Sequence, residues 1–202
     1  MKNKPIIIVA GEPYSVFLEI FFKIFNTNFY KKYKTPIILV CSKKLVMMQM
    51  KKLNFSFKIN SLKKNQLKYL ILDNDKINLI NVKLNFKKPF GKISDKSSNY
   101  IKECFNIAID IMKQKTGFAL INGPISKKHF LKGNFNGITE FLSHKIDKKD
   151  NEVMLIYNKS LSVCPITTHV AIKDVSKKIN TQLIIKKIRN INKFYKNVIK
   201  KT

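Results

Sequence analysis

The sequence predicts an α/β protein with a mostly parallel sheet and flanking helices. Two continuous apolar runs, residues 6–9 and 36–41, have the β-branched composition of strands that are buried on both faces. A helical pattern follows each run, and this alternation is typical of parallel strands joined by crossover helices. The chain has 202 residues, of which 45% are hydrophobic, so it can form a sizeable core in one large or two small domains.

The first part of the chain supplies the alternation of strands and helices. A turn at residues 11–13 ends the first strand, and Pro13 suits the first turn of a helix. Ser42 follows the second strand and can cap a second helix. The apolar positions that predict the two helices are Val16, Ile20 and Ile24 with Phe17 and Phe21, and then Leu45, Val46, Met48 and Met50.

The middle of the chain is less regular before the pattern returns. Short strands are expected at residues 69–72 and 79–82, and residues 86–98 are loop-like. A helix follows, with Ser97 or Ser98 near its start, and it ends before a buried strand at residues 118–121. The apolar positions of this helix are Ile101, Cys104, Phe105, Ala108, Ile111 and Met112.

The last third combines short elements with a closing helix. Residues 122–127 form a turn that leads into a helix, and residues 140–145 form a short helix. Strands are expected at residues 153–157 and 161–164. The closing helix is long and amphipathic, with Ile184, Ile188, Ile191, Tyr195 and Val198 on one face.

The charge of the chain is strongly positive. Lysine and arginine total 40 against 12 acidic residues, for a net charge of +28, which raises the possibility of a nucleic-acid binder. Only Arg189 is an arginine, however, and the lysines are spread along the chain. Specific nucleic-acid binding relies on arginine for bidentate contacts, so nucleic acid is not favoured as the main partner. Small phosphorylated or carboxylated substrates remain reasonable partners, because a cationic surface steers anions.

Cysteine usage and the terminal sequence indicate a cytoplasmic protein. Cys41, Cys104 and Cys164 are odd in number, widely spaced and embedded in apolar runs, as expected of free thiols in a reducing compartment. The apolar run near the N-terminus is too short for a signal peptide or a membrane span, and we expect no membrane partner.

Several loops carry the residues that favour a ligand site. His169 lies where a strand is expected to give way to a loop, a position at which a histidine can bind a metal or move a proton. A buried, hydrogen-bonded core histidine is the structural alternative. Backbone N–H groups at a helix start, together with Lys127, can hold a phosphate, although a lysine after a Gly-Pro turn is usually solvated. The four loops compared are residues 11–13, 122–127, 137–140 and 167–169.

Other sequence signals for catalysis are weak. The chain has no Gly-x-Gly-x-x-Gly fingerprint, no P-loop, no nucleophile elbow and no His-Glu-x-x-His motif. His129 and His144 are expected at the surface and do not pair with His169 on one helix. Because a catalytic metal takes about three protein ligands, His169 is the single candidate ligand that the spacing supports.

In their order along the chain, these loops resemble the 4-hydroxythreonine-4-phosphate dehydrogenase family of pyridoxal phosphate biosynthesis. The resemblance spans almost the whole chain and is carried by residues 11–13, 120–127, 137–142 and 167–175. It implies an isocitrate or isopropylmalate dehydrogenase-like fold with two α/β domains. We expect a first α/β domain at residues 1–117. A partial second α/β domain, with the candidate site loops, is expected at residues 118–202.

The resemblance also implies a reaction and its site. Family members use NAD and a divalent metal (Zn, Mg or Co) to oxidise and decarboxylate 4-phosphohydroxy-L-threonine, in a cleft at a homodimer interface. It implies that His169 is a metal ligand and that Thr139 contacts the substrate phosphate region. Such a metal stabilises the alkoxide as hydride leaves and then assists decarboxylation.

The chain departs from the family pattern in three places. Ile138 stands where the family carries a substrate-binding histidine, and isoleucine cannot donate a hydrogen bond. Bulky residues 14–19 replace a small, glycine-rich stretch. The family also continues beyond the position of Thr202 with two further metal-ligand histidines. We therefore expect a truncated or degenerate member with little or no dehydrogenase activity on its own. The alternatives are a non-catalytic binding or interaction subunit and, less favoured, a lysine-rich nucleic-acid binder.

Overall fold

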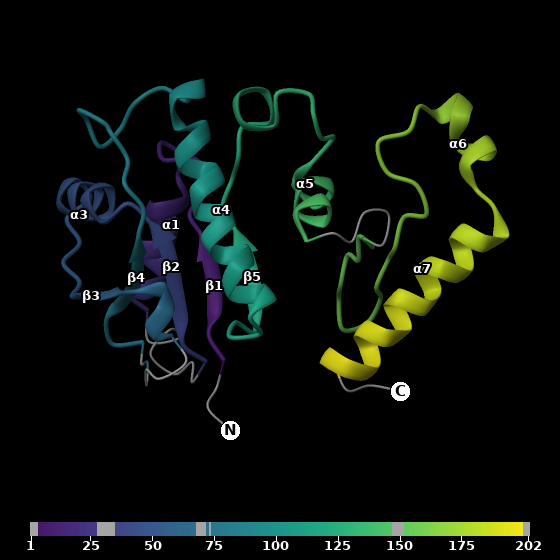
Figure 1. Cartoon of the computed structure of the whole chain (residues 1–202), viewed down its shortest axis with the longest axis horizontal. Coiled ribbons are helices and arrows are strands. Elements are labelled where there is room, and N and C mark those ends of the chain that lie inside the picture. The colour runs from purple at the N-terminus through teal and green to yellow at the C-terminus, as the bar shows by residue number, and fades with distance from the viewer. Residues whose placement is uncertain (1–3, 28–34, 68–71, 73, 147–151, 200–202) are drawn as a thin grey trace. The chain divides into compact units, whose positions relative to one another are not determined.

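The computed structural model describes residues 4–27, 35–67, 72, 74–146 and 152–199 (Figure 1). The strand expected at residues 69–72 lies almost entirely outside them. The chain forms two compact units, Met1–Lys132 and Gly133–Thr202, hereafter the N-terminal and C-terminal units.

A five-stranded, wholly parallel sheet forms the centre of the N-terminal unit, which confirms the expected α/β class. The strand order is β3-β4-β2-β1-β5. Consecutive parallel strands need long crossovers, and the helices between the strands supply them. The strands are β1 (Ile6–Val9), β2 (Ile37–Cys41), β3 (Ile59–Leu62), β4 (Ile77–Asn81) and β5 (Ala119–Asn122).

Helices cover both faces of this sheet. Helices α1 (Phe17–Phe25) and α3 (Lys43–Lys52) contact each other and share one apolar cluster with Ile8 and Leu39. Side chains alternate along a strand, so the neighbouring Ile7 points to the other face, where α4 (Ser98–Lys113) contacts the sheet. Both sets of strand side chains are buried, which explains the continuous apolar runs of β1 and β2.

The buried face of α1 differs from the predicted one. Phe21 is buried as predicted, but Val16, Ile20 and Ile24 are exposed, and the other buried side chains are Leu18, Phe22 and Phe25. Seven of the nine positions in the helix are apolar, so the pattern did not distinguish the two faces. The phenylalanine rings decide the outcome because Phe22 and Phe25 pack against Phe57, with ring centroids 6.3 and 4.8 Å apart.

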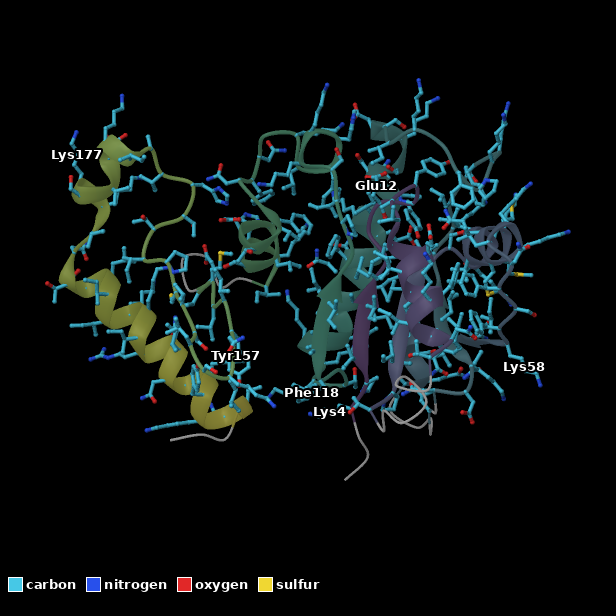
Figure 2. The ribbon with its side chains drawn as sticks, turned by 180° about the vertical axis from the view of Figure 1, so that it is seen from behind. Lys4, Glu12, Lys58, Phe118, Tyr157 and Lys177 are labelled. Carbon is cyan, nitrogen blue, oxygen red and sulfur yellow. The ribbon has the colours of Figure 1, made fainter. Side chains whose placement is uncertain are left out.

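Strand β5 is an edge strand and belongs to the N-terminal unit. It pairs with β1 alone, and Ile121 is 47% exposed, so the expectation of a fully buried strand at residues 118–121 is wrong. This pairing places residues 119–122 in the N-terminal unit, although the expected first domain ends at residue 117, and the two compact units divide after Lys132. Figure 2 shows Glu12 at the carboxyl end of the sheet, with Lys4 and Phe118 at the opposite end.

Short helical segments and loops close the N-terminal unit. Three-residue 3₁₀ turns occur at η1 (Lys64–Gln66) and η2 (Asp95–Ser97), and the second leads directly into α4. A single π-helical turn, η3 (Lys127–Leu131), follows the Gly-Pro turn after β5.

The C-terminal unit is mostly helical in its described part. Its helices are α5 (Ile138–Lys145), α6 (Ile172–Lys178) and α7 (Thr181–Phe194), followed by the π-helical turn η4 (Tyr195–Ile199). The two strands expected at 153–157 and 161–164 are reduced to a single antiparallel bridge between Ile156 and Val163. None of the described helices of the chain combines the length and hydropathy needed to cross a bilayer.

Candidate functional site

A pocket of about 340 Å³ lies within the C-terminal unit. Thr139, in the first turn of α5, and His169, in the loop before α6, both line it. The two residues are thirty positions apart, and the fold brings them to one cavity. Residues 166–170 form one stretch of its wall.

His169 is held in an unusual backbone conformation and its side chain is open to solvent. Its φ of 56° is in the left-handed region, which a non-glycine residue rarely adopts, and such strain is concentrated at functional sites. The side chain is 45% exposed, so the alternative of a buried core histidine does not apply. Its Nε2 atom lies 3.9 Å from Oε1 of Glu140.

Glu140 supplies an acidic group that the sequence argument did not single out. Its Oε2 atom is buried and has no hydrogen-bond partner among the described residues. A Cβ at position 137 would lie 2.9 Å from that oxygen and 3.7 Å from His169 Nε2, so Gly137 leaves room for both groups. The Gly-x-Thr-Glu sequence therefore places a carboxylate beside the imidazole.

Lysines give the pocket a positive wall. Lys178, Lys186 and Lys187 line it, and two of them come from one face of α7 together with Leu183 and Asn190. Lys186, Lys187 and Asn190 follow Leu183 by three, four and seven positions, which is the spacing of one helix face. The helical periodicity of the sequence could therefore have identified these four residues as neighbours. Glu140 and Glu152 line the same pocket, so the charge of its lining is mixed, and the hydroxyl and ammonium groups are the ones that can contact an anionic ligand.

Two other residues from the sequence argument lie elsewhere. Lys127 begins η3 in the N-terminal unit, is exposed and does not line this pocket. Ile138 is half-buried and is also absent from the pocket wall, although Thr139 and Glu140 follow it directly. His144 is exposed as expected.

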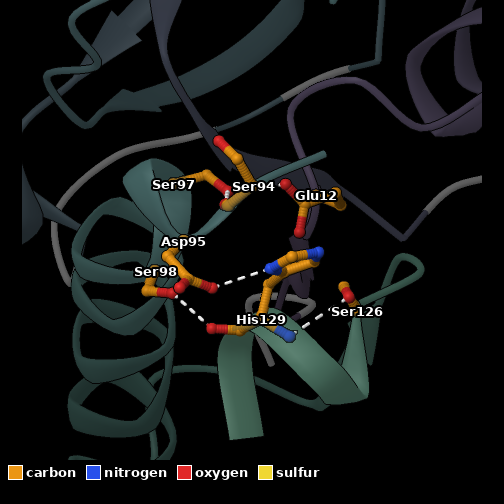
Figure 3. Close-up of polar contacts among 7 residues, drawn as sticks. All are labelled: Glu12, Ser94, Asp95, Ser97, Ser98, Ser126 and His129. Atoms are coloured by element: carbon orange, nitrogen blue, oxygen red, sulfur yellow. Dashed lines mark hydrogen bonds and ion pairs between the residues drawn. The ribbon is translucent and has the colours of Figure 1, made fainter. Parts of the chain in front are cut away.

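A second polar cluster lies at the carboxyl end of β1 (Figure 3). Glu12 is buried and accepts a hydrogen bond from the Ser97 hydroxyl at 2.6 Å, whereas its Oε2 atom has no partner among the described residues. His129, expected at the surface, is instead partly buried and lies 2.7 Å from an Asp95 oxygen through Nδ1. This hydrogen bond with His129 lowers the pKa of Asp95.

The described residues do not form a complete metal site. His169 and Glu140 offer two ligands in the C-terminal pocket. Among residues 4–27, 35–67, 72, 74–146 and 152–199, no group of three or more His, Cys, Asp or Glu side chains could hold an ion. A catalytic divalent metal takes about three protein ligands. The residues described here do not fit that requirement by themselves.

The N-terminal unit is a doubly wound α/β fold, and a polar pocket lined by both lysine and glutamate side chains lies in the C-terminal unit. Residues 32–202 match the family model described as "Pyridoxal phosphate biosynthetic protein PdxA". The chain belongs to the PdxA family.

Curated relatives agree with this assignment. The chain is 28% identical over 201 residues to the 4-hydroxythreonine-4-phosphate dehydrogenase of Wigglesworthia glossinidia brevipalpis, covering 98% of this chain and 59% of that protein. It is 33% identical over 122 residues to the enzyme of the same name from Sulfurihydrogenibium, covering 59% of this chain and 36% of the relative. The matched part thus spans 59% of the first relative's length and 36% of the second's.

Solved structures support the fold. The crystal structure of a 4-hydroxythreonine-4-phosphate dehydrogenase from Burkholderia phymatum superposes with a TM-score of 0.79 at 21% identity, over 97% of this chain and 58% of the other. The enzyme of the same name from Klebsiella pneumoniae gives a TM-score of 0.79 at 20% identity, over 96% and 59%. At these identities the likeness shows the shared fold.

Proposed function

We propose that this chain takes part in the NAD-dependent, metal-assisted oxidation of 4-phosphohydroxy-L-threonine, and that its C-terminal pocket binds the phosphorylated substrate. The observation that carries the proposal is the shared pocket of Thr139 and His169. The names of the curated relatives supply the substrate class, and the pocket's lysines suit its phosphate.

The chain's own residues would act mainly by binding and orienting. The Thr139 hydroxyl donates a hydrogen bond to a phosphate oxygen, and Lys186 and Lys187 add positive charge on the opposite segment of the lining. The Glu140 carboxylate lies 3.9 Å from the His169 imidazole, which would be a ligand of a divalent metal (Zn, Mg or Co). NAD as the hydride acceptor and a cytoplasmic location are part of the same proposal and are supported by the family assignment.

A second candidate function is a non-catalytic binding subunit derived from the same family. Ile138 favours it, because this apolar residue before Thr139 does not line the pocket and offers no hydrogen bond to a substrate. NADH formation separates the two candidates when the full chain is mixed with 4-phosphohydroxy-L-threonine, NAD+ and Mg2+ or Zn2+. Turnover that disappears in His169→Ala supports the enzyme. Substrate binding by calorimetry with no NADH formed supports the binding subunit. If the chain neither binds the substrate nor forms NADH, both candidate functions are contradicted.

We also propose that the chain forms a homodimer. Ile185, Ile188 and Phe194 of α7 are exposed, as are Leu161 and Val163 in the segment of the Ile156–Val163 bridge. Exposed apolar side chains such as these can be covered at an interface with a second copy of the chain. Light scattering on the full chain should give twice the mass of one copy, and a monomer at micromolar concentration would contradict the proposal.

A further inference from the structure

We propose that a second pocket, in the N-terminal unit, binds a nucleoside diphosphate group. The cavity has a volume of about 490 Å³ and lies beside the turn after β1 and the loop after β4. Ligands of open parallel sheets bind at the carboxyl ends of the strands, and this volume is within the range of small-molecule sites. The inference does not depend on the proposed function, because every lining residue belongs to the N-terminal unit.

Two buried polar side chains hold the walls of this pocket in place. Gln49 is 1% exposed, and its amide donates to the Pro13 carbonyl at 3.1 Å and to the Pro89 carbonyl at 2.7 Å. It therefore joins two loops that both contribute residues to the lining of the cavity. Glu12, which is 3% exposed, accepts a hydrogen bond from Ser97, and this bond holds the Ser97 part of the lining in place. Burying such polar groups is costly unless they are hydrogen-bonded, and their bonds make the pocket preformed.

The lining is positive and contains no carboxylate. Lys87, Lys88, Lys92 and Lys96 line the cavity. None of the four forms an ion pair within the described residues. Four ammonium groups around one cavity attract a ligand that carries several negative charges, and lysine is a common partner of phosphate.

Aromatic rings make up another part of the lining, and they differ in whether a ring face is free to stack on a ligand. Lys44 Nζ already lies 5.3 Å from the ring centroid of Phe86. The ring of Tyr14 packs against the loop at Gly91, where a Cβ would come within 3.3 Å of two ring carbons. Phe90 is 45% exposed at the same cavity, so its ring face can stack on a planar group. A ligand whose base stacks on Phe90 while its phosphates contact the lysines is a nucleotide.

Calorimetry with ADP on the full chain tests the proposal. We expect ADP to bind, with pyrophosphate and adenosine each binding more weakly. The K92Q/K96Q double variant should weaken ADP binding by roughly 10- to 100-fold through lost charge-assisted contacts. Phe90→Ala should weaken ADP binding roughly 10-fold and leave pyrophosphate binding unchanged, because pyrophosphate has no ring to stack.

The matched control removes the same charge away from the pocket. Lys51 and Lys52 are exposed at the end of α3 and do not line the cavity, so K51Q/K52Q should retain the affinity for ADP. No ADP binding at millimolar concentration overturns the proposal, as does an equal loss in both double variants, which would indicate diffuse charge attraction. NAD+ that competes with ADP identifies the dinucleotide as the source of the group, and ADP binding without such competition identifies a free nucleotide.

Discussion

Glu12 and Ser97 are 85 positions apart in the sequence, yet the Ser97 hydroxyl donates a buried hydrogen bond to Glu12 at 2.6 Å. The bond joins the turn after β1 to the segment that begins α4. Both residues are at most 5% exposed, so water does not replace either partner. A buried polar contact therefore links two segments at the carboxyl end of the sheet.

Removing the hydrogen bond between Ser97 and Glu12 should lower the free energy of unfolding. Ser97→Ala leaves the buried Glu12 carboxylate without its only hydrogen-bond partner among the described side chains, which costs about 1–3 kcal/mol. Urea denaturation of the full chain measures the loss. Ser56 is exposed, and Ser56→Ala should change stability by less than about 0.5 kcal/mol. Equal stability of the two variants would show that the Glu12 contact contributes nothing.

Gly11 and Gly133 provide a matched pair for backbone strain. Their φ angles are 76° and 77°, but a Cβ at Gly11 would lie 2.3 Å from the Pro124 carbonyl oxygen, whereas a Cβ at Gly133 would meet nothing within 4 Å. Gly133→Ala should cost about 1 kcal/mol for the left-handed conformation alone. Gly11→Ala should cost roughly 3 kcal/mol or more because a backbone clash is added. Similar denaturation midpoints would rule out the close approach of residues 11 and 124.

The alkaline stability of the chain should depend on Cys41. Burial raises the pKa of its thiol from 9.0 to about 11. Between these values the unfolded chain loses the thiol proton and the folded chain keeps it. The free energy of unfolding should therefore fall by about 2 kcal/mol as the pH rises from 9 to 11. Urea denaturation at several pH values should show a shallower decline in Cys41→Ala, and an identical slope would contradict the assignment.

The backbone at His169 should prefer glycine to alanine. Its φ of 56° is strained for any residue with a Cβ, so His169→Gly should be more stable than His169→Ala by about 1 kcal/mol. His144 lies inside α5 and supplies the control, because glycine is worse than alanine in a helix by about the same amount. Thermal unfolding of the four variants measures both differences. The same sign at both positions would contradict the left-handed geometry of residue 169.

Much of the fold could be predicted because its signals are local. The β-branched runs of β1 and β2 and the Ser42 cap, which accepts from the Leu45 N–H at 3.4 Å, follow from composition and spacing. Strand β3 was not predicted, because its sequence Ile-Asn-Ser-Leu carries two polar residues. Asn60 belongs there for a tertiary reason: its amide donates to the Asn78 side chain of β4 at 2.9 Å.

The candidate site was only partly visible in the sequence. His169 was chosen because it follows an expected strand and Thr139 through a family resemblance, and the fold brings both to one pocket. Glu140 was passed over, although it follows Thr139 directly, because nothing local shows that its carboxylate reaches the imidazole. Lys127 was grouped with them because it also follows a strand. Strand ends meet only within one sheet, and the Thr139 pocket is in the other unit.

The affinity of the full chain for 4-phosphohydroxy-L-threonine tests the shared pocket most directly. Calorimetry should show binding that Thr139→Val weakens roughly 10-fold, because one hydrogen bond to a charged group is lost. Thr181 is exposed at the start of α7 and outside the pocket, so Thr181→Val should bind as the unaltered chain does. Equal affinities for the two variants, or no binding by the unaltered chain, would contradict a substrate site built around Thr139 and His169.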